Sequence, residues 1–204
     1  MRLIGEGLAA LRGERMVFHN VNFMLTAGHA LVLQGPNGSG KTTLLRIIAG
    51  LLGLMAGHVR LIDDEDRPLT DERRDQSLHF ISHQDLVRAQ LRVDETLRFH
   101  AALLGAHARA VEPALEAWGL GALADVSAGL LSAGQRRRLA LARLSLQSRK
   151  LWLLDEPLVA LDASTRARLH AACLKHLESG GLLVAASHEA FLASARTLTL
   201  GHSP

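Results

Sequence analysis

The residues best suited to chemistry lie in a glycine-rich run, GPNGSGKTT, at positions 35–43. A strand-like segment, ALVLQ at 30–34, precedes the run, and a segment with helical spacing follows it. A phosphate chain needs several backbone N–H groups directed at one point, and glycines let the backbone curve that tightly. The following helix would add the positive end of its dipole. The spacing therefore predicts a phosphate-binding loop rather than a chance turn.

Within this loop, Lys41 would bring a full positive charge to the β- and γ-phosphates, and Thr42 would offer a hydroxyl to Mg²⁺. Thr43 is a further candidate for the phosphates. The residues expected to surround the nucleotide here are Gly35, Pro36, Asn37, Gly38, Ser39, Gly40, Lys41, Thr42 and Thr43.

A second signal is LWLLDEP at 151–157, in which four apolar residues run into two carboxylates. A continuous apolar run of this kind is typical of a strand buried on both faces. In open α/β sheets, ligands bind at the carboxyl ends of such strands. Asp155 is suited to hold the hydration shell of Mg²⁺, and Glu156 to orient and deprotonate an attacking water. Alone this motif is weak, but beside a phosphate loop it is strong.

A third segment, LSAGQRRRLALARL at 131–144, begins with small residues and continues as an amphipathic, arginine-rich helix. Ser132, Ala133 and Gly134 would again provide a positive helix end. From spacing alone, an ordinary serine N-cap on an arginine-rich helix is the preferred explanation of the segment.

The elements that must position these residues alternate between strands and helices. Strands are expected at 16–25, 30–34, 57–62, 78–82, 151–154, 182–187 and 197–200, and helices at 42–51, within 93–118, at 134–147 and at 163–178, with a short helix before the last strand. The polar segment 63–76 is expected to be a surface excursion. This alternation predicts an α/β domain with a largely parallel central sheet, on which the mostly helical stretch of about 85–145 is an insertion.

Composition fits one globular domain of 204 residues, with 48% hydrophobic and 21% charged residues. The net charge is +3 and the arginines are interleaved with acids, which argues against a nucleic-acid binder, although a basic patch facing anionic lipid stays possible. The lone cysteine, Cys173, can form no disulfide within the chain, which fits a reducing compartment. The apolar stretch 44–57 is too short to span a bilayer. We therefore expect a cytosolic protein whose membrane contact is peripheral.

The motifs together resemble those of the ATP-binding cassette (ABC) transporter ATPases. The phosphate loop, a glutamine, LSAGQ, LWLLDEP, ALD and a histidine after an apolar strand occur in that family's order over nearly the whole chain. The resemblance implies a P-loop NTPase fold of the ABC type over 1–204: a mixed or parallel core sheet flanked by helices, an N-terminal antiparallel β region and a helical subdomain. It also implies Mg²⁺-dependent ATP hydrolysis coupled to transport.

LSAGQ resembles the family's signature motif, with Ala133 in place of a glycine. In the family this motif covers the γ-phosphate of ATP held by another nucleotide-binding domain. Since the chain has one copy of each half-site, the resemblance implies a head-to-tail homodimer with two ATP molecules between the subunits. The signature residues in question are Ser132, Ala133, Gly134 and Gln135.

Four further residues receive roles from the resemblance alone. Gln84 resembles the loop glutamine that touches Mg²⁺, Asp162 the aspartate of the loop that communicates across the dimer, and His188 the histidine that contacts the γ-phosphate. Arg12 occupies the place where many members carry an aromatic that stacks on adenine. A guanidinium can also stack on a base, so Arg12 is a candidate to hold adenine, and the selectivity of the site for adenine over other bases is left open.

The short C-terminus and the stretches around 16–40 and 80–105 resemble one branch of the family, the haem exporter ATP-binding subunits of cytochrome c biogenesis. That resemblance implies partners among the integral membrane proteins of cytochrome c maturation, and a peripheral location on the cytoplasmic face of the inner membrane. Haem itself is not expected to bind this chain, nor is nucleic acid. The alternatives are another ABC transporter with a different cargo, a soluble cassette ATPase acting on ribosomes or DNA, or an ATP-dependent regulator that binds without turnover.

Overall fold

The computed structural model describes residues 1–83, 88–189 and 191–201. The chain forms two compact units, which we describe one at a time. The core unit comprises residues 1–80, 149–157 and 172–204, and the helical unit comprises residues 81–148 and 158–171. Gln84, to which the family resemblance assigns a contact with Mg²⁺, lies outside the described residues.

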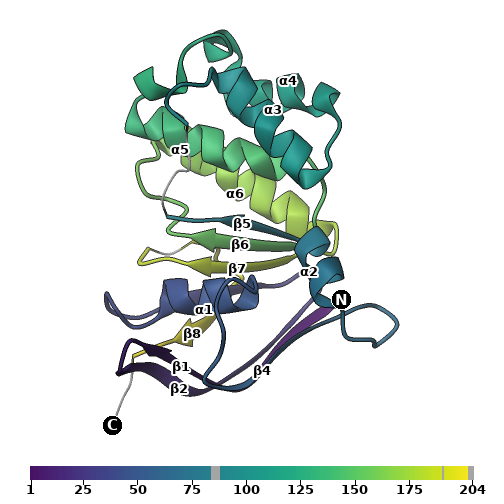
Figure 1. Ribbon diagram of the computed structural model, residues 1–204, viewed down its shortest axis with the longest axis vertical. Helices are drawn as coiled ribbons and strands as arrows, with labels where there is room; N and C mark the ends of the chain where they lie inside the picture. The colour runs from purple at the N-terminus through teal and green to yellow at the C-terminus, as the bar shows by residue number, and fades with distance from the viewer. Residues whose placement is uncertain (84–87, 190, 202–204) are drawn as a thin grey trace. The chain divides into compact units, whose positions relative to one another are not determined.

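An antiparallel sheet of three strands opens the core unit. Its order is β2-β1-β4, with β1 spanning Arg2–Arg12, β2 Arg15–Thr26 and β4 Ala56–Ile62. The central strand β1 pairs on both sides and changes register after Gly5 in its pairing with β2, which locally bends the ladder. The antiparallel β region that the family resemblance implied is therefore confirmed (Figure 1).

The second sheet carries the residues of interest. Its order is β5-β6-β7-β3-β8, and the β3–β7, β3–β8 and β6–β7 pairs are parallel. All five residues of β6 and all five of β7 are buried, as expected for strands covered on both faces. The strands are β3 at Ala30–Gln34, β5 at Leu78–Ile81, β6 at Leu151–Asp155, β7 at Leu182–Ala186 and β8 at Arg196–Thr199.

Helix α1, Lys41–Ile48, lies on this sheet and contacts β6 and β7. Its apolar face is completely enclosed: Leu44, Leu45 and Ile48 are each 0% exposed. Burial of a leucine or isoleucine side chain contributes about 1.5–3 kcal/mol. This packing fixes the start of α1, and with it the phosphate loop, against the carboxyl ends of the parallel strands.

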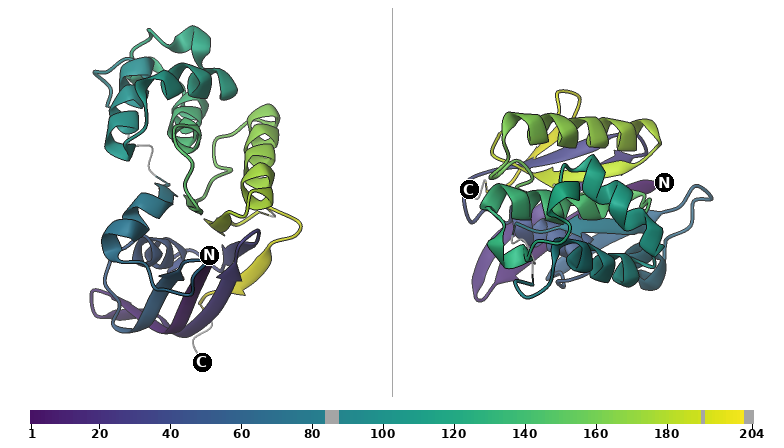
Figure 2. Two further views of the ribbon diagram at one scale, coloured as in Figure 1. Left: turned by 90° about the vertical axis from the view of Figure 1, so that its right-hand side faces the viewer. Right: turned by 90° about the horizontal axis from the view of Figure 1, so that it is seen from above.

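The helical unit contains α3 at Val93–Leu104, α4 at Val111–Ala117 and α5 at Ala133–Ala142, together with short 3₁₀ turns. Figure 2 shows these helices, teal to green, grouped together. The long helix α6, Ala163–Glu178, starts in this unit and ends in the core unit. The indole of Trp118 is 2% exposed and donates from Nε1 to Ser145 Oγ at 3.0 Å, which ties the end of α4 to the turn after α5.

The α/β fold class and most of the expected elements are confirmed, but one expectation was wrong. The polar segment 63–76 lies at the surface, as expected, and its end begins helix α2, Asp71–Ser77, which has no buried residue and is capped by Thr70 accepting from Arg73 N. The short helix expected before the last strand does not form among described residues 188, 189 and 191–195. There Ser187 Oγ accepts from Glu189 N, and Ala195 N donates to Leu192 O, so the backbone makes turns instead.

Two smaller expectations concern the surface and the core. None of the helices in the described part of the chain is long and apolar enough to cross a membrane. Cys173 is buried at 0% exposure, as predicted, and burial raises the pKa of its thiol to about 12. The thiol is therefore protonated and acts as a small apolar group.

Candidate nucleotide-binding and hydrolysis site

The phosphate loop connects β3 to α1 and is shaped by left-handed glycines. Gly40 is the N-cap residue of α1 with φ 97°, and Gly35 and Gly38 also have positive φ. A Cβ at Gly40 would lie 2.5 Å from Val17 Cγ1 and 2.8 Å from Phe18 Cδ1, so no larger residue fits between the loop and β2. The glycines thus let the backbone curve tightly just before α1, as a phosphate site at a helix start requires.

Lys41 holds its charge inside this loop. The side chain is 7% exposed, and its ammonium donates to the carbonyls of Gly35 at 2.8 Å and Pro36 at 3.2 Å. A buried ammonium is stable only when such acceptors or an anion surround it. A phosphate group can take over those bonds as a stronger, charged acceptor.

Thr42 meets Asp155 at the end of β6. Thr42 Oγ1 donates to the Asp155 carboxylate and lies 3.0 Å from each of its two oxygens, although 113 positions separate the two residues. Asp155 is 1% exposed, so this carboxylate is removed from bulk water. A hydroxyl and a carboxylate are hard oxygen donors, the type that Mg²⁺ prefers in combination with phosphate oxygens.

Glu156 follows directly and has an unusual backbone. Its φ is 47°, a left-handed value rare for a non-glycine residue, and its N–H donates to Ala186 O at 2.9 Å. This conformation costs on the order of 1–3 kcal/mol, and residues held so are common at active sites. The bond to the end of β7 fixes the direction in which the carboxylate leaves the sheet.

That carboxylate lies beside His188, which follows β7. His188 Nε2 is 3.3 Å from Glu156 Oε1, with side-chain exposures of 49% and 20%. The pair is therefore accessible to solvent and to a ligand. A carboxylate beside an imidazole can bind a water molecule and accept its proton. The core unit thus brings together four of the predicted residues, namely Thr42, Asp155, Glu156 and His188.

The signature segment forms a capped helix start in the helical unit. Ser132 Oγ accepts from Gln135 N at 3.2 Å, and Gln135 Oε1 accepts from Ser132 N at 2.8 Å, which completes a capping box. Ser132 and Ala133 are exposed. The serine cap expected from the sequence is present, and the serine and alanine remain free to meet a partner surface.

Gly134 lies against the loop that leads to Asp162. A Cβ at Gly134 would be 2.9 Å from Ala160 O, and Ala160 itself has φ 61°. Asp162 caps α6 by accepting from Thr165 N at 2.7 Å and Ser164 Oγ at 2.9 Å. These bonds, that from the Thr165 backbone first, lower the pKa of the Asp162 carboxyl to about 2. The helical unit thus joins the signature segment to the Asp162 loop.

Arg12 is the last of the residues predicted from the sequence that the structure describes. Arg12 is exposed at the end of β1, in register with Arg15 across the hairpin. Two further contributors, Ala186 and Ala160, act through main-chain atoms or backbone conformation, so their side-chain type carries no signal in the sequence.

A family model described as "ABC transporter" matches residues 18–159. The chain belongs to the ABC transporter family. The match confirms what the motifs predicted, an ATP-binding ATPase subunit of this family. Among curated relatives, the cytochrome c biogenesis ATP-binding export protein CcmA of Rhizobium meliloti is 44% identical over 93% of this chain and 92% of its own. The protein of that name from Rhodopseudomonas palustris BisB18 is 46% identical over 98% of both chains.

Solved structures in the ABC transporter family share the fold. A putative ABC transporter ATP-binding protein from Pyrococcus furiosus matches with a TM-score of 0.82 at 25% identity, covering 98% of each chain. A dimeric ATP-binding cassette in a post-hydrolysis state, bound to ADP and Pi, matches with a TM-score of 0.83 at 24% identity, covering 97% and 94%. The expected ABC-type fold is therefore confirmed.

Proposed function

We propose that this chain hydrolyses Mg-ATP for an ABC transporter of cytochrome c biogenesis, as a single nucleotide-binding domain over 1–204 with a helical subdomain at about 85–145. The observation that carries the catalytic part is the convergence of Thr42, Asp155, Glu156 and His188 in the core unit. The relatives' name, ATP-binding export protein, supports the transport part.

The chain's own groups divide the work of hydrolysis. The loop N–H groups and Lys41 bind and orient the triphosphate, so the terminal phosphorus is presented to water in one geometry. Glu156 positions that water and takes its proton, and His188 holds the carboxylate and reaches the terminal phosphate. When bound, Mg²⁺ supplies positive charge that neutralises the phosphate oxygens, and Thr42 and Asp155, with Gln84, would hold it.

The second half of the site comes from a twin subunit. Ser132, Ala133 and Gly134 stand at an exposed helix start, suited to cover the γ-phosphate of ATP bound by another copy. Each terminal phosphate then contacts two subunits, which favours the closed dimer only while it is present. Asp162 lies on the loop that would pass the state of one site to the other.

The membrane partners would be integral subunits of the cytochrome c maturation system, and the chain would lie peripherally at the cytoplasmic face of the inner membrane. Neither haem nor nucleic acid would bind the chain itself. The cargo and the direction of transport are the points on which other ABC transporters would differ.

Copurification tests this proposal. The tagged chain is expressed in its native host, and the membranes are solubilised in a mild detergent. The purified chain should be accompanied by integral cytochrome c maturation proteins and should show Mg²⁺-dependent ATPase activity. Thr42→Val should raise the Mg²⁺ concentration needed for half-maximal activity about tenfold or more, since a ligand hydroxyl is lost. ATPase activity with a different transporter's membrane subunits would contradict the assignment to cytochrome c biogenesis, and no affinity for Mg-ATP would contradict the whole proposal.

A further inference from the structure

Three consecutive arginines on α5 point in three different directions. Successive residues of a helix are turned by about 100°, so neighbouring side chains cannot share one face. Each guanidinium is directed to a main-chain carbonyl of a different segment. The bonds are Arg136 Nη1 to Leu131 O at 2.7 Å, Arg137 Nη1 to Ser82 O at 2.8 Å, and Arg138 Nη1 to Gly119 O at 3.2 Å.

The middle arginine is the most enclosed. Arg137 is 2% exposed and is among the largest fully buried side chains of the described chain. Removing a guanidinium from water is costly, and a well-packed apolar residue of similar volume often serves a purely structural role as well or better. A buried arginine at this position therefore needs a reason beyond filling space, and its bond to Ser82 supplies one.

The two ends of this bond belong to the two segments that carry proposed nucleotide contacts. Arg137 lies on α5, whose first turn contains Ser132 at the N-cap and Gly134. Ser82 follows strand β5 and precedes Gln84 by two residues along the chain. Both segments belong to the helical unit, so the bond lies within one compact body.

We propose that Arg137 is a positioning residue that links the signature helix to the segment leading to Gln84. This inference rests on the proposed function. The guanidinium keeps its bond to the Ser82 carbonyl while α5 engages a second subunit's ATP, so a displacement of the helix start is passed to the exit of β5. Arg137 touches no nucleotide itself; it sets the relative placement of two segments that do.

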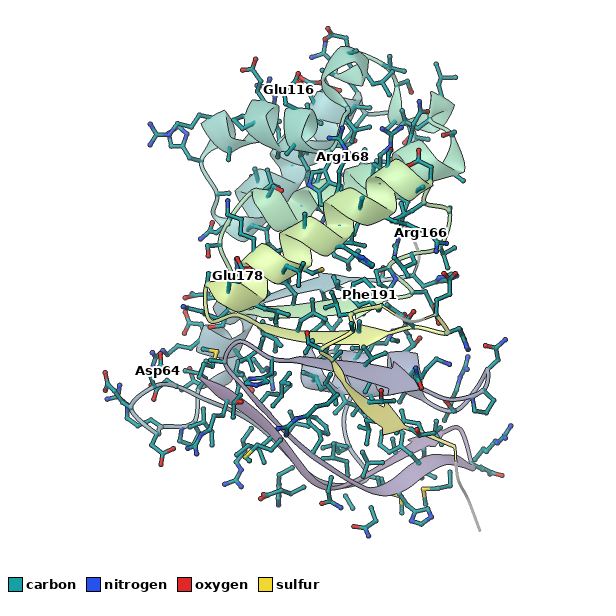
Figure 3. The ribbon with its side chains drawn as sticks, turned by 180° about the vertical axis from the view of Figure 1, so that it is seen from behind. Asp64, Glu116, Arg166, Arg168, Glu178 and Phe191 are labelled. Carbon is teal, nitrogen blue, oxygen red and sulfur yellow. The ribbon has the colours of Figure 1, made fainter. Side chains whose placement is uncertain are left out.

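The first test separates positioning from folding. Arg137→Met nearly keeps the volume and removes the donor. Arg168→Met is the control for loss of an arginine–carbonyl bond, because Arg168 Nη1 donates to the carbonyl of Ala117 at 2.9 Å in the same unit, although Arg168 is exposed (Figure 3). Arg137→Met should lower kcat about tenfold with KM within about twofold, because a small misplacement of aligned groups costs rate rather than binding. Arg168→Met should leave both unchanged. Equal kcat in the two folded variants would overturn the proposal.

A second measurement does not depend on the folding of a variant at position 137. Hydrogen exchange is followed in Glu156→Gln chains with and without saturating Mg-ATP. Amides of 78–83 should gain protection together with those of 132–140. Protection at 35–43 and 132–140 without any at 78–83 would overturn the link alone. No protection at 35–43 would instead contradict the proposed nucleotide site, and the role of Arg137 with it.

Discussion

The imidazole Nε2 of His188 lies 3.3 Å from Oε1 of Glu156, and the Glu156 backbone is held in a left-handed conformation by Ala186 O. The two side chains come from the ends of neighbouring parallel strands, β6 and β7. Their placement depends on the strand register, which sets Asp155 opposite Ala186. A carboxylate–imidazole pair, the one proposed for hydrolysis, is therefore built from the edge of a buried sheet, in the same unit as the phosphate loop.

Replacing the proposed base should abolish turnover but not binding. Glu156→Gln keeps the size of the side chain and loses its ability to accept a proton. We expect phosphate release to fall about 10²–10⁴-fold, the usual contribution of a positioned base. Nucleotide affinity should stay within a few fold, as measured with a fluorescent ATP analogue. Wild-type phosphate release by this variant would exclude Glu156 as the base.

Removing the charge of the phosphate loop should act earlier, on binding. Lys41→Ala deletes an ammonium that is 7% exposed and bonded to two loop carbonyls. We expect ATP affinity to drop at least tenfold, because a charge-assisted contact to phosphate is lost. Isothermal titration with Mg-ATP measures this directly. The control Lys41→Arg retains the charge but not the shape of the side chain, so ATP binding should be only partly retained. Unchanged ATP affinity in Lys41→Ala would contradict a role of the loop in binding phosphate.

A bulky residue at the signature segment should block the dimer and spare the fold. Ser132→Arg places a long side chain at an exposed N-cap, where loss of the cap costs about 1 kcal/mol. In a Glu156→Gln background, the chain with Ser132 intact should elute as a dimer with ATP, and the double variant as a monomer. Ser132→Asn, which preserves a cap, should still dimerise. A dimer in the Arg variant would contradict a site shared between subunits.

Restoring an aromatic at the hairpin should sharpen base selectivity. Arg12 is exposed at the end of β1, where a tyrosine could stack on adenine. We expect Arg12→Tyr to tighten ATP binding several fold and to raise the ratio of ATP to GTP affinity, since stacking of aromatic rings contributes about 0.5–1.5 kcal/mol. Competition of both nucleotides against one fluorescent probe gives the ratio. Equal ratios in the two chains would show that the base lies elsewhere.

The core unit should lose stability in mild acid through His176. The residue is 8% exposed, and its ring stacks on Trp152 with the two ring centroids 4.1 Å apart. Its Nε2 donates to Leu182 O at 3.0 Å. Burial lowers the pKa of His176 below its ordinary value near 6.5. Between the two pKa values the unfolded chain binds a proton that the folded chain does not, so stability falls as pH drops below about 6.5.

Thermal unfolding at pH 5 and pH 8 measures this loss. His176→Phe keeps a ring against Trp152 and cannot titrate, so the difference in Tm between the two pH values should shrink. The control His188→Phe removes an exposed histidine and should leave that difference in place. An unchanged difference in the His176 variant would assign the acid sensitivity to other groups.

Three segments of the site could be predicted from the sequence: the phosphate loop, the buried strand that ends in Asp155 and Glu156, and the capped helix at Ser132. Each of these is local, since glycine spacing, a continuous apolar run and a serine before a helix encode their own conformation. The role proposed for Lys41 follows from the spacing of the loop alone. The positions of these segments along the chain were therefore readable before any contact was known.

Which of these segments contact one another could not be predicted locally, because it depends on the order of the strands and on packing. Thr42 reaches Asp155 across 113 positions, and Glu156 reaches His188, because parallel strands β6, β7 and β3 bring their carboxyl ends to one edge. Nor could the run of arginines at 136–138 be interpreted locally: whether a guanidinium faces solvent or a carbonyl depends on what packs against the helix. Local rules fix conformation, whereas partners distant in sequence are chosen by burial and strand order.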